Sequence, residues 1–143
     1  MKIKTADLQG KQLRWAVAKS LGLNLDLGGW PARYQDGETY LKYVDKYLQP
    51  THIPHYEEWW EAGGPILERE GILLRPIRSP GHSLDGQCLA KYGGTNTGTI
   101  VQWVKREGLP RGYQAGPTML IAGMRCFVAS KMGDEVEIPE ELL

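Results

Sequence analysis

The sequence predicts an α+β fold, a small α/β/α-type sandwich in which two main helices pack with a short, mostly antiparallel sheet. Two observations lead to this prediction. Apolar residues recur at helical spacing near both ends of the chain, and short apolar segments separated by turn residues lie between them. The length of 143 residues suits one domain with its own core. We therefore expect a single domain over residues 1–143.

The first helix is predicted at about residues 6–21. Thr5 or Asp7 is suited to cap it, because a side-chain oxygen can accept a hydrogen bond from a free backbone N–H. Gly22 is suited to end it, because glycine adopts the left-handed conformation without a Cβ clash. The apolar stripe contains Leu13, Ala16, Val17 and Leu21, and the basic residues outside that stripe are Lys11, Arg14 and Lys19.

The last helix is predicted at about residues 117–132, between Pro117 in its first turn and Gly133 beyond its end. Large apolar residues form one stripe and small residues form the stripe beside it, so this helix should pack closely on its neighbours. We expect the first and last helices both to pack on the central sheet and to bury most of the apolar area. The two stripes consist of Leu120, Met124, Phe127 and Val128, and of Ala122, Cys126 and Ala129.

The middle of the chain predicts a short helix and three strands. The helix should begin at Gly63-Gly64-Pro65, run from Ile66 to Glu70 and end at Gly71. An edge or end strand is predicted at 72–77, because Pro76 has no N–H for a sheet. The other predicted segments are strands at 87–92 and 99–104 with a glycine-rich hairpin loop at 93–98 between them.

Both ends of the chain alternate charged and apolar residues, which is the period of a strand with one covered face. Lys2-Ile3-Lys4 is basic, and Glu135-Val136-Glu137-Ile138 is acidic. Opposed strands would place unlike charges across from each other and would put Ile3, Val136 and Ile138 on one buried face. We therefore expect the termini to lie close together, and a frayed acidic tail is the alternative.

Residues 23–60 are predicted to be an insertion with a short amphipathic helix at about 39–48. This segment holds eight of the 13 aromatic residues, which are 5 Trp, 7 Tyr and 1 Phe. Such rings are enriched at interfaces and on base-stacking surfaces, although they equally serve to anchor a long loop to a core. The candidate interaction surface consists of Trp30, Tyr34, Tyr40, Tyr43, Tyr47, Trp59 and Trp60.

The composition disfavours several classes of protein. The 17 Lys and Arg balance the 17 Asp and Glu, so a dedicated duplex-DNA binder is not expected. No apolar run approaches the length of a membrane span. The N-terminal residues do not predict a signal peptide, and the two cysteines, Cys88 and Cys126, suit a reducing compartment, so we expect a cytoplasmic protein.

Two sequence patterns approach those of nucleophilic enzymes. Gly81-His82-Ser83-Leu84-Asp85-Gly86 resembles a nucleophile elbow, but Asp85 stands where the strained turn needs a small residue. Cys126 lies on the small-residue stripe of the last helix, where cysteine usually behaves as a buried hydrophobe. We therefore predict that neither Ser83 nor Cys126 is a nucleophile, and we predict no catalytic residue and no cofactor.

Histidines and carboxylates between residues 52 and 58 offer metal ligands. His52 and His55 are separated by Ile53-Pro54, which favours extended chain, so the two imidazole rings need not converge. We therefore predict loop or surface histidines and no metal. The residues considered as additional ligands are Glu57, Glu58 and His82.

Three parts of the chain together resemble a known family: Met1–Thr5 with Trp15–Ala18, then Gly63–Glu70, and then the long run Gly116–Val136. They are similar to the NinX-like family of small phage and prophage proteins. The resemblance implies a phage product in a bacterial cytoplasm and a likeness to small phage α/β/α sandwich domains, and it implies no mechanism. Glu68, Arg69 and Arg125 fall in these parts and form either a binding surface or ion pairs between the short and last helices.

From these observations we predict a phage accessory protein that acts through protein contacts, with an unknown protein partner or as a homo-oligomer. Two alternatives remain at this point. One is an enzyme that processes a small molecule or nucleotide in a pocket beside the aromatic segment, and the other is a single-stranded nucleic-acid binder. Buried ionisable groups that converge in a pocket would favour the enzyme, and an exposed aromatic patch would favour the binding protein.

Overall fold

The principal sheet of the protein has three antiparallel strands, β4 (Leu73–Pro76), β5 (Cys88–Lys91) and β6 (Tyr113–Gly116), in the order β4-β5-β6. Pro76 lies in an edge strand, as its missing N–H requires. With the helices described below, this sheet confirms the α+β class. The structure is a computed structural model, and it describes residues 1–27, 39–92, 109 and 112–143.

The strands predicted at 72–77 and 87–92 are confirmed as β4 and β5. The strand predicted at 99–104 and the loop predicted at 93–98 lie outside the described residues. β6 was not predicted, and it pairs with β5 through Leu89 opposite Ala115. These two residues and Ile77 form a small second core on one face of the sheet, whereas Ala90 faces the main core on the other.

Helix α4 (Met119–Met132) is the centre of the molecule. It covers the principal sheet and also contacts the other two long helices. The predicted last helix is therefore confirmed, with one correction at its start. Pro117 precedes the helix, and Thr118 caps it by accepting a hydrogen bond from Ile121 N at 3.1 Å. Its fully buried side chains include Met124, Phe127 and Val128.

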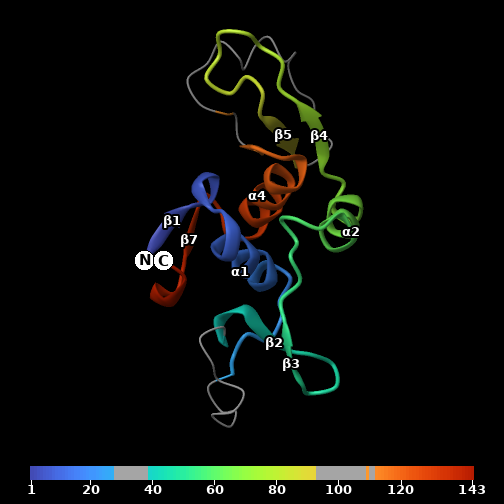
Figure 1. The fold of residues 1–143 in the computed structure, drawn as a ribbon, viewed down its shortest axis with the longest axis vertical. Coiled ribbons are helices and arrows are strands. Elements are labelled where there is room, and N and C mark those ends of the chain that lie inside the picture. The colour runs from blue at the N-terminus through green and yellow to red at the C-terminus, as the bar shows by residue number, and fades with distance from the viewer. Residues whose placement is uncertain (28–38, 93–108, 110–111) are drawn as a thin grey trace.

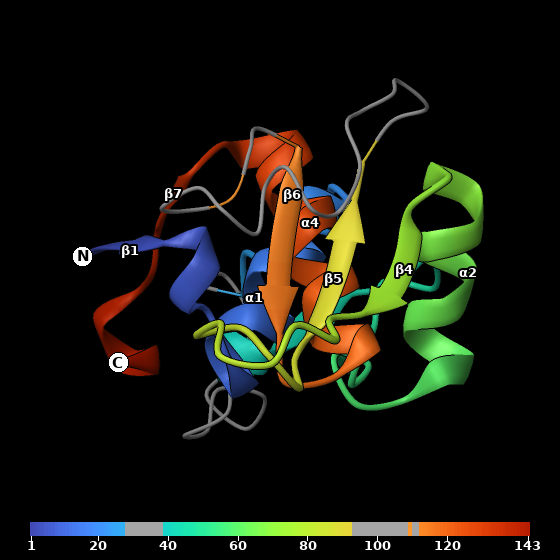
Figure 2. The same ribbon diagram turned by 90° about the horizontal axis from the view of Figure 1, so that it is seen from above.

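Helix α1 (Gly10–Ser20) packs chiefly on α4, so the expectation that it packs on the central sheet was wrong. Figure 1 therefore shows the principal sheet, α4 and α1 as successive layers, and Figure 2 shows the sheet in front of both helices. The expected cap was wrong, because Thr5–Asp7 forms a separate 3-10 turn, η1, and the N-cap residue is Gln9. The Thr5 hydroxyl instead donates to the Gly133 carbonyl at 2.6 Å. Gly22 follows the helix in the left-handed conformation, as predicted.

Helix α2 (Trp60–Glu70) begins earlier than predicted and carries both glycines and Pro65 in its interior. Propensity argued for a start after the proline, but tertiary packing outweighs it. Gly63 lies against the Tyr56 carbonyl and the Leu120 side chain, so the glycine permits close contact with α4. Gly71 ends the helix in the left-handed conformation, as predicted.

The two chain ends pair as predicted. β1 (Lys2–Lys4) and β7 (Glu135–Glu137) form an antiparallel ladder with Lys2 opposite Glu137, Ile3 opposite Val136 and Lys4 opposite Glu135. Val136 and Ile138 are buried, and Ile3 packs against the same core. Figure 1 shows both termini on one side of the molecule. Short 3-10 turn η4 (Glu140–Leu142) follows β7.

The helix predicted at 39–48 is wrong. The segment instead contains a 3-10 turn, η3 (Thr39–Leu41), followed by a hairpin of β2 (Lys42–Val44) and β3 (Pro50–His52). Asp45 stabilises the hairpin turn, because its carboxylate accepts hydrogen bonds from Tyr47 N, Gln49 N and Thr51 Oγ1. These local bonds compete with a helix, and the hairpin lies beyond α1 at the end of the molecule away from the principal sheet (Figure 1).

None of the described helices is long and apolar enough to cross a membrane.

Candidate functional site

The predicted aromatic surface is exposed over most of its described part. Tyr40, Tyr47, Trp59 and Trp60 are 40%, 72%, 47% and 56% exposed, respectively. Tyr43 is half-buried and packs against the main core. Trp30 and Tyr34 lie outside the described residues.

The exposed rings come from two elements. Tyr40 and Tyr47 belong to the hairpin region, whereas Trp59 is the N-cap residue of α2 and Trp60 is its first helical residue. Tyr56, from the same insertion, is buried in the main core. Residues 39–60 therefore contain both rings that anchor the segment and rings that remain in solvent.

The polar cluster predicted at Glu68, Arg69 and Arg125 separates into two surroundings. Glu68 and Arg69 are exposed on α2, and Arg69 pairs with Glu70 at 3.2 Å. Arg125 lies on α4 and donates to the carbonyls of Leu8 at 2.8 Å and Ala115 at 2.9 Å. Burial lowers the pKa of Arg125. The two hydrogen bonds that its guanidinium donates connect α4 to the N-terminal segment and to β6.

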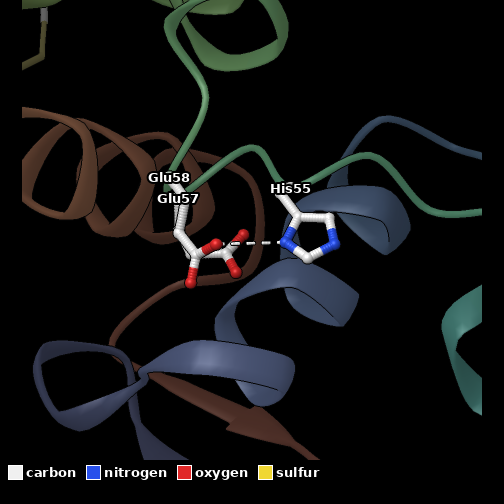
Figure 3. Close-up of side chains that lie close together, drawn as sticks. All are labelled: His55, Glu57 and Glu58. Atoms are coloured by element: carbon white, nitrogen blue, oxygen red, sulfur yellow. Dashed lines mark hydrogen bonds and ion pairs between the residues drawn. The ribbon is translucent and has the colours of Figure 1, made fainter.

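His55, Glu57 and Glu58 lie close together in the segment that leads into α2 (Figure 3). One ligand atom from each lies within 4.8 Å of the others. His55 Nδ1 and Glu58 Oε2 are 3.1 Å apart, and the His55 ring stacks on Trp59 with centroids 4.3 Å apart. His52 is exposed on β3 and is not a member of this group.

The carboxylate of Glu57 is engaged by a buried arginine. Arg14 Nη2 donates to Glu57 Oε1 at 2.6 Å, and Arg14 Nε lies 3.0 Å from Oε1 and 3.4 Å from Oε2. The Glu57 side chain is only 2% exposed. A buried ion pair of this kind holds α1 against the segment before α2. Arg14 was expected outside the buried stripe of its helix, and this expectation was wrong because Glu57 supplies a counter-charge inside the core.

This pairing changes what the histidine and carboxylate group can do. A cation between His55 and the two carboxylates would approach an oxygen pair that already faces the guanidinium of Arg14. The positive charge of Arg14 opposes a second cation at that place. The group therefore fits a structural tie, with Glu58 and His55 at its solvent side, better than it fits a metal site.

Ser83 and Cys126, the two residues predicted not to be nucleophiles, lie in different surroundings. Ser83 is exposed in the loop between β4 and β5, and the neighbouring His82 accepts a hydrogen bond from Leu84 N through Nδ1 at 3.0 Å. Burial raises the pKa of Cys126 to about 12. A thiol with that pKa is almost wholly protonated near neutral pH, so Cys126 lacks the thiolate that a nucleophile needs.

Sequence reasoning missed the outer face of α2, which consists of Trp60, Glu61, Gly64, Pro65 and Glu68. The opposite face carries the buried residues Gly63, Ile66 and Leu67. The missed signal was the spacing of Trp60, Gly64 and Glu68, four residues apart on one side of a helix. It was hidden because Gly63-Gly64-Pro65 was expected to start the helix.

A family model described as bacteriophage P22 NinX matches residues 4–131 of the chain. This match covers most of the sequence and runs from before α1 to the last turn of α4. The chain belongs to the bacteriophage P22 NinX family. No curated protein matches the chain significantly.

Proposed function

We propose that this NinX-family protein is a non-catalytic phage accessory protein that acts through protein contacts in the cytoplasm of the bacterial host. The observation that carries the proposal is the exposure of four large aromatic side chains, Tyr40, Tyr47, Trp59 and Trp60, within one segment of the chain. Exposed tryptophan and tyrosine are enriched at protein interfaces, where they contribute most of the binding energy.

The charges beside the two tryptophans favour a protein over a nucleic acid, whereas Lys46 Nζ lies 5.1 Å from the centroid of the Tyr47 ring. Glu58 and Glu61 flank the two tryptophans in the sequence, and both glutamates are exposed. Surfaces that stack single-stranded bases combine aromatic rings with a positively charged groove. Carboxylates next to the two tryptophans would instead repel phosphates.

The test is affinity capture of a tagged copy from induced or infected cells, followed by mass spectrometry. A variant with Tyr47→Ala, Trp59→Ala and Trp60→Ala is compared with the wild type. Leu73→Ala is the matched control, because Leu73 is an equally exposed apolar residue on β4. Circular dichroism verifies that all three proteins are folded.

We expect the wild type and the control to capture the same protein and the triple variant to lose it. Retention of that protein by the folded triple variant would overturn the proposal. Capture of a second copy of this chain alone would identify the surface as a homo-oligomer interface, which native mass measurement verifies. An activity that depends on His55, Glu57 or Glu58 would favour an enzyme instead.

A further inference from the structure

The outer face of α2 has a distinctive composition for an exposed helical surface. Trp60, Gly64 and Glu68 follow each other at intervals of one turn, and Glu61 and Pro65 lie beside them. The Trp60 side chain leans over Gly64, since a Cβ built on Gly64 would lie 3.7 Å from Trp60 Cε3. A large ring therefore borders a flat strip of helix that has no side chain at residue 64.

The two adjacent glycines differ in what the fold requires of them. A Cβ on Gly63 would collide with the Tyr56 carbonyl oxygen and would lie 2.8 Å from Leu120 Cδ2, so packing explains this glycine. A Cβ on Gly64 would make only the ordinary contact with Trp60. Glycine inside a helix is less favourable than alanine, and nothing in the packing of Gly64 compensates for it. Gly64 is half-buried beside Trp60, and a close approach by another molecule explains the absent side chain at this position.

Pro65 adds a hydrogen-bond acceptor to the same face. In an α-helix the N–H of residue 65 would bond to the carbonyl of residue 61, and proline has no N–H. The Glu61 carbonyl therefore lacks its ordinary α-helical donor. Its oxygen and the Glu61 carboxylate both suit a partner that brings hydrogen-bond donors.

The charge of this face is acidic and uncompensated. Across the described ranges, neither Glu61 nor Glu68 forms a side-chain hydrogen bond or ion pair, whereas Glu70 at the inner side contacts Lys131 and Arg69. Two free carboxylates beside an exposed indole form a surface for cations, because the indole face attracts a guanidinium or ammonium group. Phosphates would be repelled by the same carboxylates.

We propose that the outer face of α2 binds a basic segment of a partner protein, with a Lys or Arg side chain over Trp60 and others paired with Glu61 and Glu68. This inference rests on the proposed interaction function and specifies the chemistry of its partner. The strip at Gly64 and Pro65 lets the backbone of the basic segment approach the helix. The carboxylates of Glu61 and Glu68 identify the occupant as basic, which the apolar surface of Trp60 alone would not do.

The experiment titrates the full-length protein with an alternating glycine–arginine peptide and follows indole N–H signals by NMR. The Trp60 signal is identified by its loss in Trp60→Phe, and the buried Trp15 is an internal reference. We expect the peptide to shift the Trp60 indole and the α2 amides while leaving Trp15 unchanged. An alternating glycine–glutamate peptide should shift neither.

Variants test each part of the face. Glu61→Gln with Glu68→Gln should weaken peptide binding about fivefold to tenfold, and Trp60→Ala should weaken it about threefold. Gly64→Leu should block binding while the helix stays folded, since leucine is a good helix former. The control pair Asp134→Asn with Glu140→Gln changes the net charge equally and should bind as the wild type does. These residues border β7, which lies with the C-terminus on the side of the molecule away from α2 in Figure 1.

Three results would overturn the inference. Equal weakening by the control pair would mean that the peptide senses only net charge. A shift of Trp60 by a single-stranded oligonucleotide but not by the basic peptide would assign the face to nucleic acid. If the protein partner is captured from cells equally by the wild type and by Glu61→Gln with Glu68→Gln, the basic-segment inference fails while the proposed interaction function stands.

Discussion

Glu57 and Glu61 are four residues apart in the chain, the first before α2 and the second in its first turn, and they have opposite surroundings. The Glu57 side chain is 2% exposed and holds Arg14 through two close contacts, whereas Glu61 is exposed and has no side-chain partner among the described residues. The same residue type therefore serves as a structural tie at one position and as an available charge at the other. The comparison shows that burial and pairing, not residue type, separate structural from candidate binding groups in this protein.

The largest expected effect tests the buried glutamate, Glu57. Glu57→Ala should lower the free energy of unfolding by about 3–5 kcal/mol, because the Arg14 guanidinium would remain in the core without a counter-charge. Glu61→Ala should change it by less than about 0.5 kcal/mol. Urea denaturation of both variants measures the difference. Equal, small losses would mean that water reaches Arg14 and that the pair is not a structural tie.

The next effect concerns the reactivity of the buried Cys126 thiol in the folded and the unfolded protein. The Cys126 pKa of about 12 lies far above that of a free thiol, so its thiolate fraction at pH 8 should be lower by about three powers of ten. Iodoacetamide should therefore leave Cys126 unmodified in the native protein and alkylate it in urea. Peptide mass spectrometry identifies the modified site. Rapid alkylation of Cys126 in the folded protein would show an accessible thiolate and would favour the enzyme alternative.

The two glycines sharpen the comparison between the inner and outer faces of α2. Gly63→Ala should cost about 1–3 kcal/mol of unfolding free energy, because its Cβ would collide with the Tyr56 carbonyl and Leu120. Gly64→Ala should be neutral or stabilising by up to about 1 kcal/mol, since alanine favours the helix and has room. Thermal and urea unfolding curves compare them. Destabilisation by Gly64→Ala would assign that glycine to the fold and weaken the argument for a binding face.

The smallest effect concerns an exposed charge that does have a partner. A hydrogen bond from the N-terminal ammonium lowers the pKa of Glu137. A carboxyl whose folded pKa is depressed contributes stability above its unfolded pKa, and that contribution is lost as the pH falls through the folded pKa. Glu137→Gln should therefore lower the Tm slightly at neutral pH, less at high salt, and not at all at strongly acidic pH.

Melting curves of the wild type and Glu137→Gln across this pH range decide the matter. A Tm difference that persists unchanged at strongly acidic pH would show that the substitution acts through strand pairing and not through the carboxylate charge. This pair is an intermediate case between Glu57 and Glu61, since it is both paired and exposed.

The sequence pattern alone predicted the last helix and the pairing of the chain ends. The last helix followed from its apolar stripe and from Gly133, and the pairing of the chain ends followed from the alternation of Lys2-Ile3-Lys4 and Glu135-Val136-Glu137. The helix followed from its own apolar pattern, whereas the pairing of the ends also used the opposite charges of the two segments. The candidate aromatic residues were proposed from the composition of residues 23–60.

The failed predictions were decided by contacts that the local apolar pattern does not show. The helix expected at 39–48 lost to the hydrogen bonds of Asp45, and the start of α2 was misplaced because Gly63 matters for its contact with α4. Strand β6 was missed because its short sequence carries no clear alternation and gains its order from pairing with β5. In each case a partner elsewhere in the chain, or a competing side chain, decided the local structure.

The sequence by itself determined the α+β class, the family resemblance, the helical cores of α1 and α4 and the meeting of the termini. Only the tertiary structure decided that Arg14 and Glu57 meet in the core, that α1 packs chiefly on α4, and that Trp60, Glu61 and Glu68 share an outer face. The physical reason is that periodicity encodes which side of an element is apolar. It does not encode which element covers that side, or which charges find a counter-charge there.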